Sequence, residues 1–299
     1  MPRIEVDKEL LAALHQLEGR SGKDWISSVE DRKQSEAEFH DKSHELTPNS
    51  GSLERGGRWS NSKFYRTTSA SKGYLDSWMR DHVEGAVVLD YACGNGVFGL
   101  RAADAGARFV IGIDISQQSI QNARELAASK GISDTTFFVQ GDCEETRLPS
   151  ESIDVVLCGG VLHHLDLSYA LPELRRIMKP GAVLLAAEPL NYNPAIKLYR
   201  RLTPHLRTTF EAEHILTHND LKFISRFLDI QDVRYFHLFS VLTAPLLGTR
   251  FFDGALRLAN LLDGVILKVK PFCYLAWQVY FELARPEVSK NKNESVEVL

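Results

Sequence analysis

The chain has 299 residues, of which 44% are hydrophobic and 25% are charged, and its formal net charge at pH 7 is −4. These values are ordinary for a soluble globular protein with one large domain, or one domain and an accessory region. They give no support for nucleic-acid binding, which is usually accompanied by a basic domain. The four cysteines lie far apart and form no Cys-x-x-Cys pair. The sequence therefore predicts no zinc site and no disulfide framework, and it favours a cytoplasmic location.

Residues 1–84 predict a helical region that precedes the main domain. Leucines at positions 10, 11, 14 and 17 share one face of a short amphipathic helix, and the acidic start argues against a signal peptide. Residues 19–60 are polar, so we expect loop, short helix and partial disorder there. Residues 61–84, which include Tyr65, predict a helix that leads into the core.

The stretch from Val87 to Gly99 carries the strongest signal for a binding site. Residues 87–90 read as a buried strand that ends in an acid, followed by a turn with Gly94 and Gly96 and then by a helix. Glycines let the backbone turn tightly and let a ligand approach closely, and the helix points its unpaired N–H groups at the turn. This pattern predicts a site for a nucleotide-type cofactor.

Two classes of cofactor are compatible with this turn. Gly94, Gly96 and Gly99 match the dinucleotide fingerprint G-x-G-x-x-G, which leaves an NAD(P)-dependent oxidoreductase open. The carboxylate of Asp90, however, would repel a pyrophosphate and would suit a ligand with an ammonium group. The stretch resembles motif I of the class I S-adenosylmethionine-dependent methyltransferases, Asp-x-Gly-x-Gly-x-Gly, with Ala92 in place of the first glycine. A backbone contact from Ala92 is expected only if its φ is negative.

Strands and helices then alternate, as is typical of a parallel sheet with helices on both faces. Asp114 ends the second strand and is expected to accept hydrogen bonds from ribose hydroxyls, as acids at this place do in such folds. Ser116 is expected to cap the next helix, which stops at Gly131. The strands after the first are expected at 108–114, 136–140, 155–158 and 183–188.

Strand four continues into Gly159 and then into His163 and His164. The resemblance places the backbone of this segment beside the methionine end of the cofactor, with its side chains toward the acceptor. Histidine is the commonest general base, so both histidines are candidate catalytic residues. The structural alternative is one buried histidine and one exposed histidine. Adjacent residues cannot both aim at one metal ion without further ligands, so we expect no metal.

The resemblance also implies the remaining cofactor contacts. In the family, the acid after strand three takes the adenine amino group and the next backbone N–H meets the ring; Asp142 and Cys143 occupy these places. The acids at the strand ends, Glu188 included, are expected to converge on one edge of the sheet. The predicted cofactor-binding residues are Tyr65, Asp90, Ala92, Cys93, Gly94, Asn95, Gly96, Asp114, Ile115, Asp142, Cys143, Cys158 and Gly159.

After strand five the family's core needs one more helix and two strands. Thr217 and Asp220 form a capping box that opens a helix. We expect strand six at 232–238 and the last strand at 273–283, followed by a disordered charged tail at 285–299.

Two insertions interrupt this part of the chain. Residues 190–216 follow strand five and are expected to lie over the acceptor side. Residues 239–271 are unusually apolar. They fit a pair of packed helices, a homodimer contact, an acceptor tunnel or a peripheral membrane contact.

Together these features predict an α/β protein with a Rossmann-like, seven-stranded, mostly parallel sheet and helices on both faces. A methyltransferase domain is expected at 85–284, with an N-terminal helical lid in 1–84 and a helical C-terminal insertion. The predicted reaction moves a methyl group from S-adenosyl-L-methionine to a small, apolar acceptor such as a quinone precursor, a lipid or a secondary metabolite. Oxidoreduction with NAD(P), and methylation of a polar metabolite or a macromolecule, stay open as alternatives.

Overall fold

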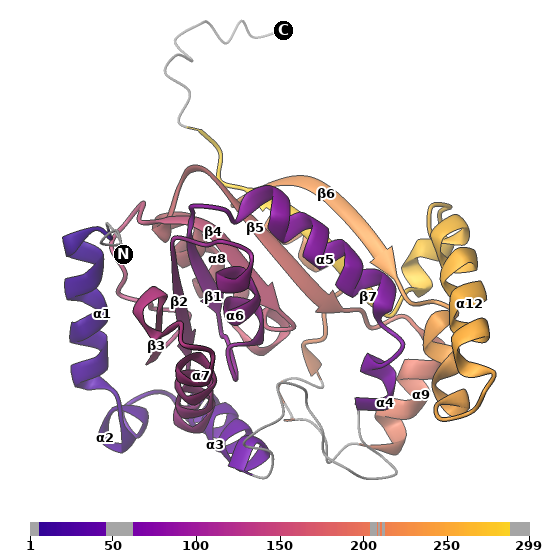
Figure 1. Ribbon diagram of the computed structural model, residues 1–299, viewed down its shortest axis with the longest axis horizontal. Coiled ribbons are helices and arrows are strands. Elements are labelled where there is room, and N and C mark those ends of the chain that lie inside the picture. The colour runs from indigo at the N-terminus through magenta and orange to yellow at the C-terminus, as the bar shows by residue number, and fades with distance from the viewer. Residues whose placement is uncertain (1–5, 46–61, 204–207, 209, 211–212, 288–299) are drawn as a thin grey trace, which may run out of the picture.

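The computed structural model describes residues 6–45, 62–203, 208, 210 and 213–287. Its centre is one seven-stranded sheet in the order β3-β2-β1-β4-β5-β7-β6 (Figure 1). The pairs β3·β2, β2·β1, β1·β4 and β4·β5 are parallel, whereas β7 runs antiparallel to both β5 and β6. The strands are β1 Val87–Tyr91, β2 Phe109–Asp114, β3 Thr136–Gln140, β4 Ile153–Gly159, β5 Met178–Pro189, β6 Asp229–Phe236 and β7 Gln278–Ala284. The predicted fold class is confirmed.

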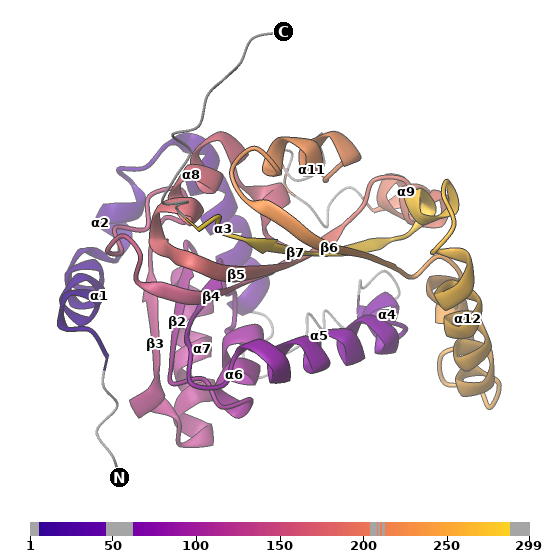
Figure 2. The same ribbon diagram turned by 90° about the horizontal axis from the view of Figure 1, so that it is seen from above.

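Helices cover both faces of the sheet. Figure 2 shows α5, α6 and α7 on one face and α8 and α11 on the other. The α-helices are α1 Lys8–Arg20, α2 Lys23–Ile26, α3 Asp31–Glu45, α4 Ser62–Tyr65, α5 Ser69–His82, α6 Val97–Asp104, α7 Gln117–Lys130, α8 Leu167–Ile177, α9 Pro194–Leu202, α11 His218–Ile224 and α12 Phe252–Ile266. The 3-10 turns are η1 Ser133–Thr135, η2 Leu162–His164, η4 Ser240–Leu246 and η5 Phe272–Leu275.

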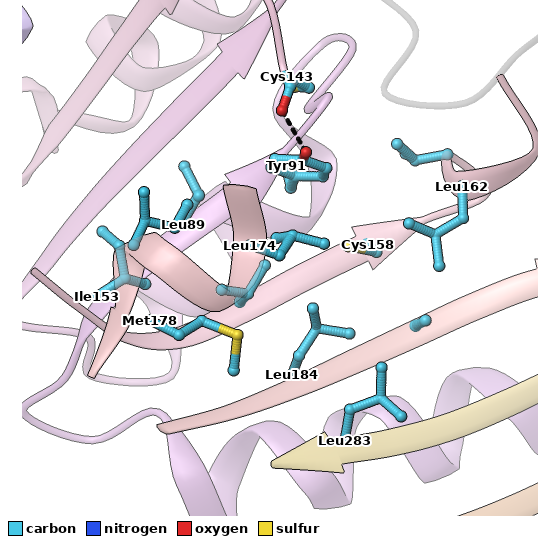
Figure 3. Close-up of a cluster of buried hydrophobic side chains, with 14 of the residues drawn as sticks. Leu89, Tyr91, Cys143, Ile153, Cys158, Leu162, Leu174, Met178, Leu184 and Leu283 are labelled. Atoms are coloured by element: carbon cyan, nitrogen blue, oxygen red, sulfur yellow. Dashed lines mark hydrogen bonds between the residues drawn. The ribbon is translucent and has the colours of Figure 1, made fainter. Parts of the chain in front are cut away.

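The hydrophobic core lies between the sheet and these helices. The central strands are buried along their whole length, so they read as continuous apolar runs rather than as an alternating pattern. Figure 3 shows part of the largest cluster, in which Leu89, Leu174 and Leu184 meet from β1, α8 and β5. The buried hydroxyl of Tyr91 donates to the carbonyl of Cys143, which ties the end of β1 to the segment after β3 (Figure 3).

Local signals in the sequence placed several helix ends correctly. The hydroxyl of Ser116 accepts from the N–H of Ser119 at 3.0 Å, and Gly131 ends α7 with φ of +70°. Thr217 and Asp220 form the predicted capping box of α11. These caps depend on neighbouring residues alone, so sequence is sufficient to predict them.

Three predicted strand boundaries need correction. Strand six runs from Asp229 to Phe236 and not over 232–238. The last strand begins at Gln278 and not at 273, because Phe272–Leu275 turns as η5 before the strand starts. β5 begins at Met178 and not at 183. The turn at residues 179–181 lies within the strand, because the pairing of β5 with β4 shifts register between Ile153 and Val155. The polar stretch at 19–60, where we expected loop, short helix and partial disorder, contains a longer helix of 15 residues, α3.

Parts of other predictions fall outside the described residues. These are positions 46–60 of the polar stretch, positions 204–207, 209, 211 and 212 of the first insertion, and positions 288–299 of the predicted tail. Among the described residues, no helix is long and apolar enough to cross a membrane.

Candidate functional site

The glycine turn joins β1 to α6 at the carboxyl edge of the sheet. Gly94 and Gly96 have φ of +50° and +75°, which favours glycine at both positions. A Cβ on Gly96 would lie 2.8 Å from the ring of Phe138, so this glycine is also required by packing within the protein. The carboxylate of Asp90 accepts from the N–H of Gly99 at 2.7 Å and thereby fixes the turn to the strand.

Ala92 departs from the expectation for this turn. Its φ is +51°, in the left-handed region, so the negative φ on which the expected backbone contact depended is not found. The family's first glycine adopts such a conformation without strain, but alanine pays roughly 1–2 kcal/mol for it. The turn therefore keeps a backbone shape suited to glycine although its residue is alanine.

Asp114 links the glycine turn to the start of α7. One carboxylate oxygen accepts from the N–H of Gly94 at 2.7 Å, and the other accepts from the N–H of Ser116 at 2.8 Å. Asp114 is buried, as is Asp90. Burial, opposed by the hydrogen bond from Gly99 and reinforced by the charge of Asp114, raises the pKa of Asp90 to about 8. The two strand-end acids thus meet at one turn, as the sequence predicted.

Helix α3 covers this edge of the sheet (Figure 1). Near its start, the ammonium of Lys33 lies 2.7 Å from a carboxylate oxygen of Asp142 and 2.8 Å from one of Glu144. Near its end, the carboxylate of Asp41 accepts from the hydroxyl of Ser116 at 2.6 Å. Sequence reasoning did not single out Lys33, and it named no partner for Asp41. Asp142, predicted to take the adenine amino group, is held by an ion pair.

A hollow lies beside Asp142. Its volume is about 330 Å³, and its lining includes Trp25, Lys33, Gln140 and Gly141. The side chain of Gln140 closes part of it, accepting from the N–H of Gly22 at 2.8 Å and donating to the carbonyl of Ile115 at 3.0 Å. The carbonyl of Ile115, a predicted cofactor contact, therefore already accepts a hydrogen bond from Gln140.

His163 and Glu188 form a buried pair at the ends of β4 and β5. Nδ1 of His163 lies 2.7 Å from one carboxylate oxygen of Glu188, and the other oxygen accepts from the N–H groups of Val161 and Leu162, each at 2.8 Å. Glu188 is completely buried and His163 is 5% exposed. A carboxylate only accepts, so in the neutral ring of His163 the hydrogen lies on Nδ1 and the electron pair on Nε2. The sequence predicted that Glu188 would lie on this edge, but not that it would orient His163.

His164 reaches toward α3, while its ring stays beside that of His163, with centroids 4.3 Å apart. Its Nδ1 lies 3.1 Å from a carboxylate oxygen of Glu36, and Nε2 of His40 lies 3.7 Å from the same oxygen. Burial opposes ionisation of Glu36, but hydrogen bonds from His164, His40 and Thr208 outweigh it and hold the pKa of Glu36 well below its usual range. One metal-binding atom from each of Glu36, His40 and His164 lies within 4.8 Å of the other two. The two adjacent histidines thus have different hydrogen-bond partners, and His164 joins α3 to the segment after β4.

The remaining predicted contact residues divide into core and surface positions. The side chains of Cys93, Cys143 and Cys158 are buried, and burial raises the pKa of each thiol well above its usual value. Any contact of these three cysteines with a cofactor must therefore use their backbone atoms. Tyr65 is 37% exposed and packs against Trp277 with ring centroids 5.5 Å apart, in line with a packing role.

The two other predicted contact residues, Asn95 and Gly159, lie next to the glycine turn. The side-chain oxygen of Asn95 accepts from the amide of Asn122 at 3.1 Å, which ties the turn to α7. Gly159 is exposed at the end of β4, where a Cβ would lie 2.9 Å from the ring of Phe98. The absence of a side chain at Gly159 therefore leaves room for Phe98.

Residues 82–228 match a family described as a methyltransferase domain. Protein arginine N-methyltransferase 1 of Dictyostelium discoideum is 27% identical over 173 residues, which are 51% of this chain and 50% of that protein. The 27-O-demethylrifamycin SV methyltransferase of Amycolatopsis mediterranei is 34% identical over 98 residues, which are 32% of this chain and 36% of that protein. The matches thus span half or less of these relatives' own lengths.

Solved structures show a similar fold. The geranyl diphosphate C-methyltransferase of Streptomyces coelicolor A3(2), solved with Mg²⁺, geranyl diphosphate and S-adenosyl-L-homocysteine, aligns with a TM-score of 0.59. The alignment covers 86% of this chain and 99% of that chain at 13% identity. At this identity the likeness concerns the fold alone.

Proposed function

We propose, on the premise that residues 82–228 match a methyltransferase domain, that this chain is a class I S-adenosylmethionine-dependent methyltransferase that methylates a small, apolar acceptor. S-adenosylmethionine supplies a methyl group made electrophilic by the adjacent sulfonium. The residues of this chain would hold that cofactor, place the acceptor in line with the methyl group and, where needed, remove a proton.

The shape and charge of the glycine turn fit this cofactor. The backbone at Gly94 and Gly96 is left-handed and leaves no side chain over the turn. Asp114 would offer carboxylate oxygens to the ribose hydroxyls, and Asp142 would accept from the adenine amino group. Burial raises the pKa of Asp90 to about 8, and the positive charge of a cationic ligand bound beside it would favour the ionised form of this carboxyl.

The pair of His163 and Glu188 is the observation that carries the proposed chemistry. The hydrogen bond from Nδ1 to Glu188 orients the ring and leaves Nε2 as the basic atom. Glu188 also stabilises the imidazolium that forms when His163 takes a proton. The pair would therefore deprotonate an acceptor hydroxyl or an acidic carbon. His164, which is bound to Glu36 on α3, would hold the lid rather than act as a base.

Apolar side chains support an apolar acceptor. α9 follows β5 directly, and its buried Ile196 meets Val241, Trp277 and Phe64 in a separate cluster. The ring of Phe64 also lies against Tyr199, with centroids 4.7 Å apart. This cluster gives the segment after β5 an apolar and aromatic character. The relatives from Dictyostelium and Amycolatopsis act on a protein and on a small molecule, as their names state, so a macromolecular acceptor is the competing proposal.

A labelling experiment separates these proposals. The protein is incubated with a cell extract and S-adenosylmethionine carrying a labelled methyl group, and label is measured in the organic, aqueous and acid-precipitated fractions. We expect label in the organic fraction, and we expect its loss with Asp114→Ala or His163→Ala. Label in the precipitated protein would contradict a small acceptor, and label in water-soluble metabolites would contradict an apolar one. Cofactor binding retained by His163→Ala, measured by calorimetry, controls for loss of the site.

A further inference from the structure

One end of the molecule exposes an unusual number of large apolar side chains. They belong to α9, to α12 and to the 3-10 turns η4 and η5, which we call the apolar end. Leu261, Val265 and Leu198 are 67%, 62% and 60% exposed. Figure 1 shows α9 and α12 together at the end of the sheet where β6 ends and β7 begins. The Leu246 and Leu247 side chains are only partly exposed, so α12 contributes more of this surface than η4 does.

Helix α12 is apolar on two opposite faces. Leu256 and Ala259 are buried against the protein, and Asp263 on the same face accepts from the N–H groups of Phe239 and Ser240 at 2.7 and 3.1 Å. The opposite face exposes Leu258, Leu261, Leu262 and Val265, which follow the spacing of one helical stripe. A surface helix normally carries polar residues on its outer face. This outer face is therefore built for an apolar environment.

Cationic side chains border the apolar end. Lys197 and Arg201 on α9 and Arg257, Lys268 and Lys270 around α12 are exposed. Within 194–202 and 239–275, all of which the structure describes, Asp253 is the one exposed acid, since Asp263 is buried. The whole chain carries a net charge of −4, so this local excess of positive charge is not a property of the surface in general.

We propose that the apolar end docks on the surface of a bilayer that contains anionic phospholipids. Helices with an apolar outer face and flanking lysines and arginines lie in the interfacial region, where apolar side chains enter the acyl boundary and cations meet the headgroups. A symmetric second copy is a poorer occupant, because a twofold contact would bring the same cationic border against itself. The inference goes beyond the proposed function and does not depend on the identity of the acceptor.

The position of α9 connects this surface to the site. α9 starts five residues after Pro189, and Glu188 lies at the same end of β5. Its inner face packs through Ile196 and Tyr199, while Leu198 and Leu202 point outward. If the acceptor is apolar, which rests on the proposed function, docking would place a membrane-dissolved acceptor next to the helix that follows Glu188.

Vesicle sedimentation with the full chain tests the docking. Wild-type protein should sediment with vesicles of phosphatidylcholine mixed with phosphatidylglycerol, and much less with phosphatidylcholine alone. Replacing Leu258, Leu261 and Val265 together by serine should abolish sedimentation, whereas Tyr169→Ser, which removes a residue 63% exposed on distant α8, should leave it unchanged. Reversing Lys197 and Arg201 to glutamate should weaken binding roughly tenfold or more, because each basic residue near an anionic surface contributes about 1 kcal/mol.

Each result decides for or against the bilayer. Failure of the wild-type protein to bind anionic vesicles would overturn the proposal, and so would binding that the triple serine variant retains. A dimer in light scattering that the triple variant disperses, without vesicle binding, would assign the surface to a second copy. Urea unfolding of each variant shows whether it is folded, and the labelling experiment with extract tests the methyl transfer separately.

Discussion

Replacement of Glu188 tests the proposed base more directly than replacement of His163 itself. Glu188 accepts three hydrogen bonds in a fully buried position, two from backbone N–H groups and one from His163. In Glu188→Gln the amide oxygen can keep both backbone bonds. The amide nitrogen then faces Nδ1 of His163 as a donor. The ring must therefore move its hydrogen to Nε2, and it loses its basic atom toward the acceptor.

The expected magnitudes follow from these contacts. Glu188→Gln exchanges charge-assisted bonds for neutral ones, which costs about 1–2 kcal/mol of stability. Glu188→Ala leaves the N–H groups of Val161 and Leu162 and the ring of His163 unpaired, which costs roughly 3–5 kcal/mol. General-base catalysis contributes about 10²- to 10⁴-fold in rate, so Glu188→Gln should lose that factor while remaining folded.

Two assays separate the chemical effect from the structural one. Nitrogen-15 NMR of the histidine ring reports which nitrogen of His163 carries the hydrogen, and urea unfolding gives the free energy of unfolding. We expect Nδ1–H in the wild type and Nε2–H in Glu188→Gln, with a loss of methyl transfer to the labelled acceptor fraction. An unchanged tautomer in Glu188→Gln, or a full rate with the shifted tautomer, would refute the reasoning.

Three other changes test the turn. Asp114→Ala should weaken binding of S-adenosylhomocysteine in calorimetry by about 1–3 kcal/mol, because a ribose hydroxyl loses its acceptor, and unchanged affinity would remove that assignment. The pKa of Asp90 is raised from 3.8 to about 8, so the folded protein holds a proton that the unfolded chain releases, and the free energy of unfolding should fall as pH rises from about 4 to about 8. Asp90→Asn should flatten this part of the profile in urea titrations, and a profile identical to wild type would exclude the raised pKa. Ala92→Gly should raise the free energy of unfolding by up to about 1 kcal/mol, because glycine adopts the left-handed conformation without strain. As a control, Ala102→Gly inside α6 should lower the free energy of unfolding by about 1 kcal/mol. A lower free energy of unfolding in both variants would show that Ala92 is unstrained.

The sheet and the turn could be predicted from sequence because their signals are local. The apolar run of β1, the glycines after it and the caps of α7 each depend on a few neighbouring residues. The carboxyl-end rule for parallel sheets then brings Asp90 and Asp114 to one turn without further information. Ala92 shows the limit of local reasoning, since the left-handed conformation at that residue is imposed by the whole turn rather than by alanine itself.

The contacts of α3 could not be predicted, because they join distant parts of the chain through residues that are ordinary when seen alone. Glu36 and His164 are 128 positions apart, and Lys33 and Asp142 are 109 positions apart. A polar helix such as α3 has no apolar stripe from which a buried face could be predicted. Its charged residues are ordered because the strand-end acids and His164 offer them partners. The edge of the sheet that carries the predicted cofactor site thus also provides the binding partners of α3. A prediction of this packing from sequence would have to compare the charges of α3 with the charges of that edge.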